Sequence, residues 1–240
     1  MTHPALTHPF PFTAGAVPAA ASSAPDDELR RDLICRALNV LVAVIGLVLT
    51  APLMGLIAIL IKLTSPGPVI YRQVRVGWNR RAGRAPRSDG GMDDESCGMP
   101  FTIYKFRTMR VAAVGATQVW AQRNDPRITP VGLVLRKFRL DELPQLYNVV
   151  IGDMNVVGPR PEQPDIVRRL RTSIRNYAAR QRVLPGITGL AQVTMGYDQS
   201  VDDVRRKVAL DLEYVRRRSP LEDLRIMART TLVMLGAHGT

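Results

Sequence analysis

The chain has 240 residues, including 33 Lys or Arg and 21 Asp or Glu, and its formal net charge is +12. This length can bury a substantial core, and the charge predicts anionic partners such as phosphorylated ligands, acidic membranes or nucleic acid. The three histidines, His3, His8 and His238, lie near the termini, and the two cysteines form no Cys-x-x-Cys pair. A disulfide framework, Ser/His/Asp or Cys/His catalysis and histidine-ligated zinc are therefore excluded, which leaves carboxylates, Arg, Lys and a hard metal ion.

The N-terminal part predicts a tail and an apolar helix. Residues 1–29 begin with a stretch rich in Ala, Pro, Ser and Thr, without the basic start of a signal peptide, and we predict a disordered tail. Residues 30–64 include an uncharged run, 37–61, that is long enough to cross a bilayer core of roughly 30 Å. Pro52 predicts a break or kink there. Cations on both flanks favour a membrane-embedded re-entrant helix over a spanning one, because both ends would then lie on the cytoplasmic side.

Residues 65–240 predict a mostly helical cytosolic domain with short strands, which makes the fold class α+β and membrane-associated. Lys105 and Arg107 lie in an alternating stretch, so that both would project from one strand face, toward phosphates or solvent. The strands are predicted at residues 69–73, 101–109 and 154–157, and helices at 131–138 and from the Asp-Glu pair to about 151.

The other segments predict two loops, a strand that follows the second loop, and three helices. Residues 79–98 lack periodicity and predict a flexible surface loop, in which the acidic cluster 93–95 reads as solvated charge. A basic helix is predicted over 164–182, and a Gly-punctuated loop over 184–193 that runs into a strand. Two amphipathic helices follow, one over 200–218 with a Ser200/Asp203 capping box and one from Pro220. Their apolar stripes either dock in the core or lie on the membrane.

Two adjacent carboxylates, Asp141 and Glu142, directly follow a cluster of three cations within residues 135–145. They are explained as the start of a helix, with Asp141 as N-cap, or as a functional pair in which one attacks or accepts while its neighbour holds a metal. Arg160 stands between two prolines, and this stiff turn suits a placed ligand contact as well as a surface cation.

These motifs occur together and in order. They comprise the Pro-broken apolar helix and residues 65–69, 104–109, 140–145, 158–162 and 185–193. Over roughly residues 30–236 the chain closely resembles the bacterial sugar transferase family, the monotopic polyprenyl-phosphate phosphoglycosyltransferases. The resemblance is to the minimal catalytic form, because the large multi-span N-terminal region of longer relatives is not seen in this sequence.

The resemblance implies transfer of a sugar-1-phosphate from a UDP-sugar to undecaprenyl phosphate, with release of UMP, as the first step of exopolysaccharide or O-antigen-type glycan assembly. It implies that Asp141 is the nucleophile of a covalent phosphosugar-aspartate intermediate, and that Glu142 assists with Mg²⁺ as its ligand. The expected phosphate-binding residues are Lys105, Arg107, Arg136 and Arg160, and Gln145 and Asp211 are further site candidates.

The expected location is the bacterial inner membrane, with the catalytic domain on the cytoplasmic face. Expected partners are undecaprenyl phosphate, the UDP-sugar and inner-membrane lipids, while association with itself or with downstream glycosyltransferases is left open. Nucleic acid is not expected, because only 5% of the residues are aromatic and no recognition-helix pattern occurs. The alternative function is an inactive membrane-tethered scaffold or regulator, since residues 194–198 replace an Asn-Gly-Arg found in many relatives. A separate departure from the family pattern is Ala51, which precedes Pro52 where many relatives carry Ser.

Overall fold

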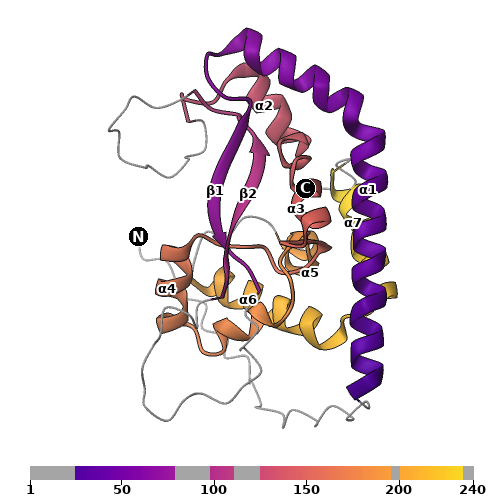
Figure 1. Cartoon of the computed structure of the whole chain (residues 1–240). Coiled ribbons are helices and arrows are strands. Elements are labelled where there is room, and N and C mark those ends of the chain that lie inside the picture. Colours follow the sequence, from indigo (N-terminus) through magenta and orange to yellow (C-terminus); the bar gives the residue numbers. More distant parts are fainter. Residues whose placement is uncertain (1–24, 79–97, 111–124, 196–200, 235–240) are drawn as a thin grey trace, which may run out of the picture.

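The computed structural model describes residues 25–78, 98–110, 125–195 and 201–234 (Figure 1). One long helix, α1 (Pro25–Thr64), runs along the side of a helical body with two small sheets. The predicted α+β class, mostly helical with short strands, is confirmed. The predicted tail up to residue 24, the loop 79–97 with its acidic cluster, and Ser200 of the capping box lie outside the described residues.

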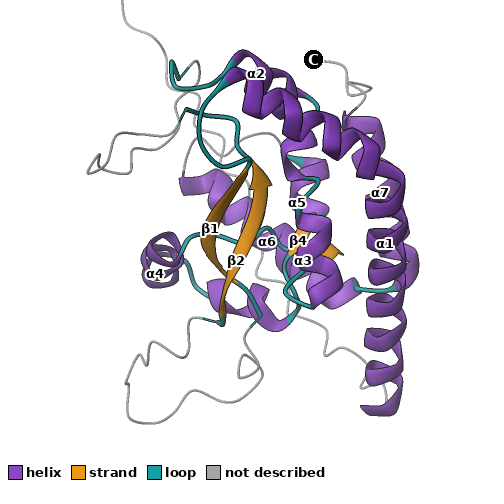
Figure 2. Cartoon of the chain, turned by 45° about the horizontal axis from the view of Figure 1, so that its top comes forward, coloured by secondary structure: helices purple, strands orange, loops and turns teal. Residues whose placement is uncertain are grey.

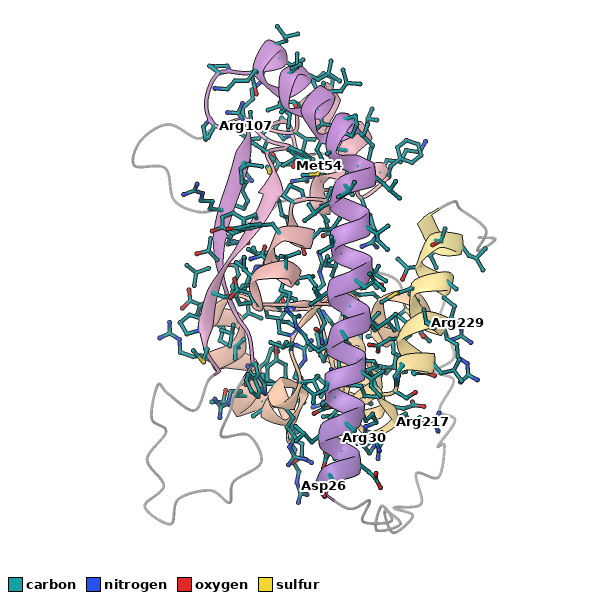
Figure 3. The ribbon with its side chains drawn as sticks, turned by 45° about the vertical axis from the view of Figure 1, so that its right-hand side comes forward. Asp26, Arg30, Met54, Arg107, Arg217 and Arg229 are labelled. Atoms are coloured by element: carbon teal, nitrogen blue, oxygen red, sulfur yellow. The ribbon has the colours of Figure 1, made fainter. Side chains whose placement is uncertain are left out.

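Helix α1 is continuous, and it begins at Pro25, so residues 25–29 belong to the helix and not to the predicted tail. Pro52 lies inside it. Because proline has no backbone N–H, the carbonyl of Val48 loses its helical partner, and the helix bends near Met54 without breaking (Figure 3). Within the described ranges, α1 is the only helix that is long and apolar enough to cross a membrane.

The first half of α1 is fastened to the body by polar side chains. Arg36 donates to the carbonyl oxygen of Met154 at 2.6 Å. Asn39 is fully buried, donates to Asp223 Oδ2 at 2.7 Å and accepts a hydrogen bond from the Val157 N–H at 3.0 Å. Such buried and satisfied polar contacts fix the orientation of the helix, because breaking one would leave a buried group unpaired.

The second half of α1 is held by apolar contacts. Ile57 and Ile61 are buried against Phe106 and Leu135. The opposite face carries exposed apolar side chains along most of the helix, among them Leu41, Val48, Leu49, Leu56, Ile59 and Leu63. One face of α1 therefore contacts the body near both ends, while the other presents a long apolar surface.

Two small sheets lie within the body (Figure 2). In the first, β1 (Ile70–Val76) pairs antiparallel with β2 (Pro100–Phe106), and in the second, β3 (Asn155–Val157) pairs parallel with β4 (Gly186–Thr188). The predicted strand 101–109 ends earlier than expected, at Phe106, and Met109 forms only an isolated bridge.

The segment that carries the Asp-Glu pair connects two short helices. It consists of α2 (Pro130–Lys137), the 3₁₀ helix η2 (Leu140–Glu142) and α3 (Gln145–Ile151), which agrees with the predicted helices. Gly132 lies so close to the end of β2 that a Cβ there would collide with the backbone of Thr108. Only glycine permits this approach, which brings the start of α2 beside the chain that follows β2.

Two predicted elements in the second half of the chain are wrong. The basic helix over 164–182 is interrupted: α4 (Pro164–Ser173) ends, Asn176 adopts the left-handed conformation at φ 64°, and η3 (Tyr177–Arg182) follows. Residues 191–193 form no strand, because they lie in α5 (Leu190–Thr194). Short apolar runs are ambiguous between helix and strand, and tertiary contacts decide between them.

The last two helices, α6 (Val201–Arg217) and α7 (Pro220–Met234), differ in how they use their apolar stripes. The α6 stripe docks in the core, where Val208 packs with Val76 and Val167. Helix α7 buries Ile226 but leaves Leu221, Leu224 and Leu232 exposed. Because α7 lies beside α1, its exposed side chains adjoin the apolar helix (Figures 2 and 3).

Candidate active site

The Glu142 carboxylate is the centre of a buried charge cluster. Lys105 Nζ and Arg160 Nη2 both lie against Glu142 Oε1, at 2.7 and 2.6 Å. A longer contact of 3.4 Å joins Arg160 Nη1 to Glu142 Oε2. The structure thus brings three of the predicted site residues into direct contact, although they are 18 and 37 positions apart in the sequence.

Three separate elements supply these side chains, and Asn148 holds two of them together. Lys105 comes from β2, Glu142 from η2, and Arg160 from the turn after β3. Asn148 of α3 accepts from the Tyr104 N–H at 3.1 Å and donates to the Thr102 carbonyl at 2.7 Å. The side chain of Asn148 therefore substitutes for a strand partner, and it sets the position of η2 and α3 against β2.

The charges in the cluster shift one another's pKa values. Burial opposes ionisation of Glu142, but Arg160 and Lys105 outweigh it and hold its pKa well below the usual range. The same carboxylate raises the pKa of Arg160. Burial lowers the pKa of Lys105, and Glu142 opposes that shift. Glu142 is therefore ionised at neutral pH, and it anchors two cations beside Asp141.

Asp141 is half-buried and lies within η2, so its interpretation as a helix N-cap is wrong. Arg139 occupies the cap position of η2 and adopts the left-handed conformation at φ 53°. Burial, reinforced by the charge of Glu142, raises the pKa of Asp141, while Lys105 and Arg136 oppose this shift. A raised pKa makes a carboxylate more basic, and a more basic oxygen is a better nucleophile.

Arg136 and Gln145 lie on either side of η2 in the sequence. Arg136 is in the last turn of α2, where its Nε donates to Thr108 Oγ1 at 2.9 Å. Gln145 is 1% exposed, and its Nε2 finds no hydrogen-bond partner in the part of the chain that the structure describes. A buried donor without a partner is costly, so we expect this amide to meet a ligand or water.

Arg107 does not share a face with Lys105, which corrects that prediction. Because β2 ends at Phe106, the alternation stops there, and the Arg107 side chain is buried. Its guanidinium donates to the carbonyl oxygen and Oγ of Ser65, at 2.7 and 2.8 Å, and to the carbonyl oxygen of Pro66. Arg107 thus joins the end of α1 to the end of β2, and its contact with a substrate phosphate stays a prediction.

Two arginines hold the turn that presents Arg160. Arg180 Nη2 donates to the Arg160 carbonyl oxygen at 2.8 Å, and Arg75 Nη1 donates to the Pro161 carbonyl oxygen at 3.1 Å. Sequence reasoning missed both, because neither lies near a motif and only the fold brings them to this turn. Their contacts show that they position Arg160 through its backbone.

Asp211 does not reach the Glu142 cluster. It is 2% exposed on α6, and its Oδ2 lies 2.6 Å from Arg180 Nη2. Beside it, Glu162 pairs with Lys207 at 2.9 Å. Asp211 therefore orients the arginine that holds the Pro-Arg-Pro turn, and it acts on the site from a distance.

Replacing Asp211 with Asn will lower the free energy of unfolding by about 1–3 kcal/mol, because buried Arg180 loses its contacting carboxylate. The loss is smaller than for an uncompensated charge, since burial raises the pKa of Asp211 despite Arg180, and Glu162 still acts on Arg180. Asp202→Asn is the matched control, because Asp202 is also on α6 but forms an exposed pair with Arg205. Its removal will change stability by less than about 1 kcal/mol. Chemical unfolding in detergent measures both, and equal effects would contradict the proposed role of the buried pair.

Glu142 has one carboxylate oxygen that could bind a divalent cation. Mg²⁺ prefers oxygen ligands and is typically held by one or two carboxylates together with substrate phosphates. Glu142 Oε1 is occupied by two cations, but Oε2 has only the long contact with Arg160. Glu142 Oε2 therefore fits one position of this donor set, and substrate phosphates would supply the others. No group of three or more potential protein ligands occurs among the described residues.

Comparison with known proteins gives a consistent picture. The family described as Bacterial sugar transferase matches residues 30–237. A UDP-N-acetylgalactosamine-undecaprenyl-phosphate N-acetylgalactosaminephosphotransferase from Aeromonas hydrophila is 41% identical over 206 residues, 86% of this chain and 44% of that protein. A UDP-glucose:undecaprenyl-phosphate glucose-1-phosphate transferase from Caulobacter vibrioides is also 41% identical, over 85% of this chain and 70% of that protein.

A shorter relative is matched over nearly its whole length. Exopolysaccharide production protein PSS from Rhizobium leguminosarum bv. phaseoli is 36% identical over 82% of this chain and 92% of that protein. Several other relatives are much longer, and the chain spans less than half of the Aeromonas protein. The shared region contains every site residue described above.

Proposed function

Because the chain belongs to the bacterial sugar transferase family, we propose that it transfers a sugar-1-phosphate from a UDP-sugar to undecaprenyl phosphate and releases UMP. The names of the Aeromonas and Caulobacter relatives support this reaction. The observation that carries the proposal is Asp141, a half-buried carboxylate with a raised pKa, next to two cations that Glu142 holds in place.

In the first step, we propose that an Asp141 oxygen attacks the phosphorus that bears the sugar. The new bond is an acyl phosphate, and the bond that breaks joins this phosphorus to the bridging oxygen, so that UMP leaves with the electron pair. Lys105 and Arg160 stabilise the charge on the phosphate oxygens, because they lie beside the nucleophile in a largely buried site. Glu142 keeps both cations in position during this step.

In the second step, a phosphate oxygen of undecaprenyl phosphate attacks the same phosphorus. The acyl phosphate bond breaks, and Asp141 is restored as a carboxylate. The product contains a diphosphate between lipid and sugar. Dividing the transfer in this way allows donor and acceptor to react in turn at one nucleophile.

We propose Mg²⁺ as the cofactor, held by Glu142 Oε2. When bound, it supplies positive charge to the diphosphate oxygens. The site can hold it without losing the contacts at Oε1, because Oε2 is the less occupied oxygen of Glu142.

We propose that α1 is re-entrant and that the catalytic body lies on the cytoplasmic face of the inner membrane. The packing of α1 supports this: Arg36 contacts the body near one end and Ile61 near the other. A helix that crossed the bilayer would carry one of these contacts to the far side. The bend at Pro52 and the exposed apolar face allow the helix to enter the membrane while both ends stay with the body.

The alternative function is a tethered scaffold with the same fold and no turnover. The decisive experiment measures UMP release by the purified chain with undecaprenyl phosphate, Mg²⁺ and a panel of UDP-sugars. We expect UMP with at least one donor, dependent on lipid for repeated turnover and abolished by a chelator. Absence of UMP with every donor, from folded protein in membrane mimetics, would reject the proposed reaction and favour the scaffold. We also propose that the chain initiates glycan assembly, because its product would be a lipid carrier that bears a first sugar.

A further inference from the structure

A cavity of about 150 Å³, partly open to solvent, adjoins the charge cluster and is lined by residues of η2, α3, β4, α5 and α7 and by Arg139. Its wall is chiefly apolar and includes Leu143, Leu146, Ile187, Val193 and Val233. The polar groups in the wall satisfy one another or the backbone: Thr188 Oγ1 lies 2.7 Å from Thr230 Oγ1, and Gln192 Nε2 donates to the Ile187 carbonyl oxygen at 2.9 Å. This lining offers a ligand little hydrogen bonding and suits a hydrocarbon.

The cavity wall contains two charged side chains, Arg139 and Glu142. Glu142 is already paired with Lys105 and Arg160. The Arg139 guanidinium has no hydrogen bond or ion pair within the described ranges of the chain, although its backbone is fixed in the left-handed conformation at φ 53°. A non-glycine residue in this conformation is unusual and costs about 1–2 kcal/mol. The fold thus holds an unpaired cation where an apolar cavity meets the catalytic carboxylates.

The cavity also adjoins the apolar helix. Leu146 of the cavity wall contacts α1, since a Cβ added at Gly46 would lie 3.1 Å from Leu146 Cδ1. On the opposite element, Val233 lines the cavity while the neighbouring Leu232 is exposed on α7. Helix α7 lies beside α1 (Figure 3). One wall element, α7, therefore also carries exposed apolar side chains, and another, α3, packs against the apolar helix α1.

We propose that this cavity binds the first isoprene unit of the prenyl phosphate acceptor and that Arg139 binds its phosphate. The inference rests on the proposed function and adds the position of the acceptor. A dry cavity of roughly 150 Å³ accommodates a six-carbon ring such as benzene in another protein, so a five-carbon isoprene unit fits the space here. The isoprene unit would contact the apolar wall of the cavity, and the phosphate would pair with the Arg139 guanidinium at its edge.

The donor fits this cavity poorly. A UDP-sugar presents uracil, hydroxyl groups and phosphates, and burying them against Leu and Val side chains would leave polar groups unpaired. Bulk phospholipid is the remaining competitor, because it also combines an anionic head with hydrocarbon. The experiment must therefore separate three ligands: prenyl phosphate, phospholipid and nucleotide sugar.

Photolabelling of the full chain in lipid nanodiscs makes that separation. The probe is a prenyl phosphate with a diazirine on the isoprene unit nearest the phosphate. We expect labelled peptides from residues 186–194 and 220–234, and loss of the label with excess undecaprenyl phosphate but not with phosphatidylglycerol or a UDP-sugar. Labelling only outside these peptides and residues 139–146, which also line the cavity, would overturn the proposal, as would equal displacement by phosphatidylglycerol or displacement by the UDP-sugar alone.

Steady-state kinetics provide an independent test with two pairs of variants. Arg139→Gln and the cavity-filling Val233→Trp will each raise the KM for undecaprenyl phosphate about tenfold or more, and will change the KM for the UDP-sugar less than about twofold. Lys137→Gln and Leu232→Trp are the matched controls, because both residues are exposed and neither lines the cavity. Arg139→Lys will recover part of the acceptor affinity.

Each outcome of these tests is informative. Equal rises in both KM values, or a fall in kcat alone, would overturn the acceptor assignment. If the wild-type chain turns over no donor, the proposed reaction fails while the photolabelling result still decides whether prenyl phosphate occupies the cavity.

Discussion

Replacing Asp141 with Asn will reduce UMP formation by roughly a thousandfold or more, because the amide cannot form the acyl phosphate. The structure places Asp141 beside Lys105 and Arg160, and its pKa is raised by burial and by Glu142. A donor labelled with ³²P at the sugar-bearing phosphate provides the direct measurement. Without lipid acceptor, the wild-type chain will retain label and Asp141→Asn will not.

The same substitution will leave the fold intact or stabilise it. The folded-state pKa of Asp141 is higher than that of an ordinary Asp, so ionised Asp141 destabilises the folded chain at neutral pH. Asn is neutral at every pH and avoids this cost. Asp141→Asn should therefore melt at the same or a higher temperature than wild type near pH 7. The difference should disappear as the pH falls below the pKa of Asp in the unfolded chain.

Asp165→Asn is the control for lost charge, because Asp165 is exposed on α4 and belongs to no site described above. It should retain full activity and the same melting temperature. Full label retention by Asp141→Asn would contradict the nucleophile assignment, and a large fall in its melting temperature would contradict the raised pKa. The two measurements separate catalysis from stability.

Local patterns predicted most elements of the fold but not how the side chains meet. The helix predicted at 131–138 corresponds to α2, in which Thr129 caps the first turn, and alternation identified β2. The same alternation failed at Arg107, because the strand ends at Phe106, before Arg107, and the side chain turns to the carbonyl groups that follow α1. Beyond the end of a strand the two-residue alternation no longer decides which face a side chain occupies.

The motifs identified the chemical groups of the site, while its supporting contacts depend on the fold. Lys105, Glu142 and Arg160 were all predicted as site residues, yet no spacing rule states that Lys105 and Arg160 share one oxygen of Glu142. Arg75 and Arg180 carry no motif, and their contacts with backbone carbonyls follow only from the packing of β1 and η3 against the Pro-Arg-Pro turn. Long-range polar contacts of this kind cannot be read from local sequence.

Replacing Glu142 with Gln will lower both stability and activity. The amide is neutral, so Lys105 and Arg160 will repel one another in a largely buried site, at a cost of about 3–5 kcal/mol in the free energy of unfolding. Activity should fall at least a hundredfold, because the two cations lose their common anchor and the proposed Mg²⁺ ligand is weakened. Unfolding in detergent and UMP release measure the two effects separately.

The effect of Glu142→Gln on stability will depend on pH. Arg160 and Lys105 hold the folded-state pKa of Glu142 below the ordinary value of 4.5, despite its burial. The ionised carboxylate therefore stabilises the fold fully above that ordinary value, and this stabilisation is lost as the pH falls toward the folded-state pKa. The difference in unfolding free energy between wild type and variant should be constant near neutrality and shrink below about pH 4.5.

Glu162→Gln separates the structural part of this effect from the catalytic part. Glu162 is half-buried and pairs with Lys207 and Arg75, and Lys207 and Arg180 hold its pKa low against the effect of burial. Its substitution should destabilise the chain, but folded Glu162→Gln protein should keep much more activity than Glu142→Gln at the same folded fraction. If both variants lose activity only in proportion to unfolding, Glu142 is a structural anchor. If Glu142→Gln alone is inactive when folded, the carboxylate is needed for catalysis through the cations that it positions and the proposed Mg²⁺.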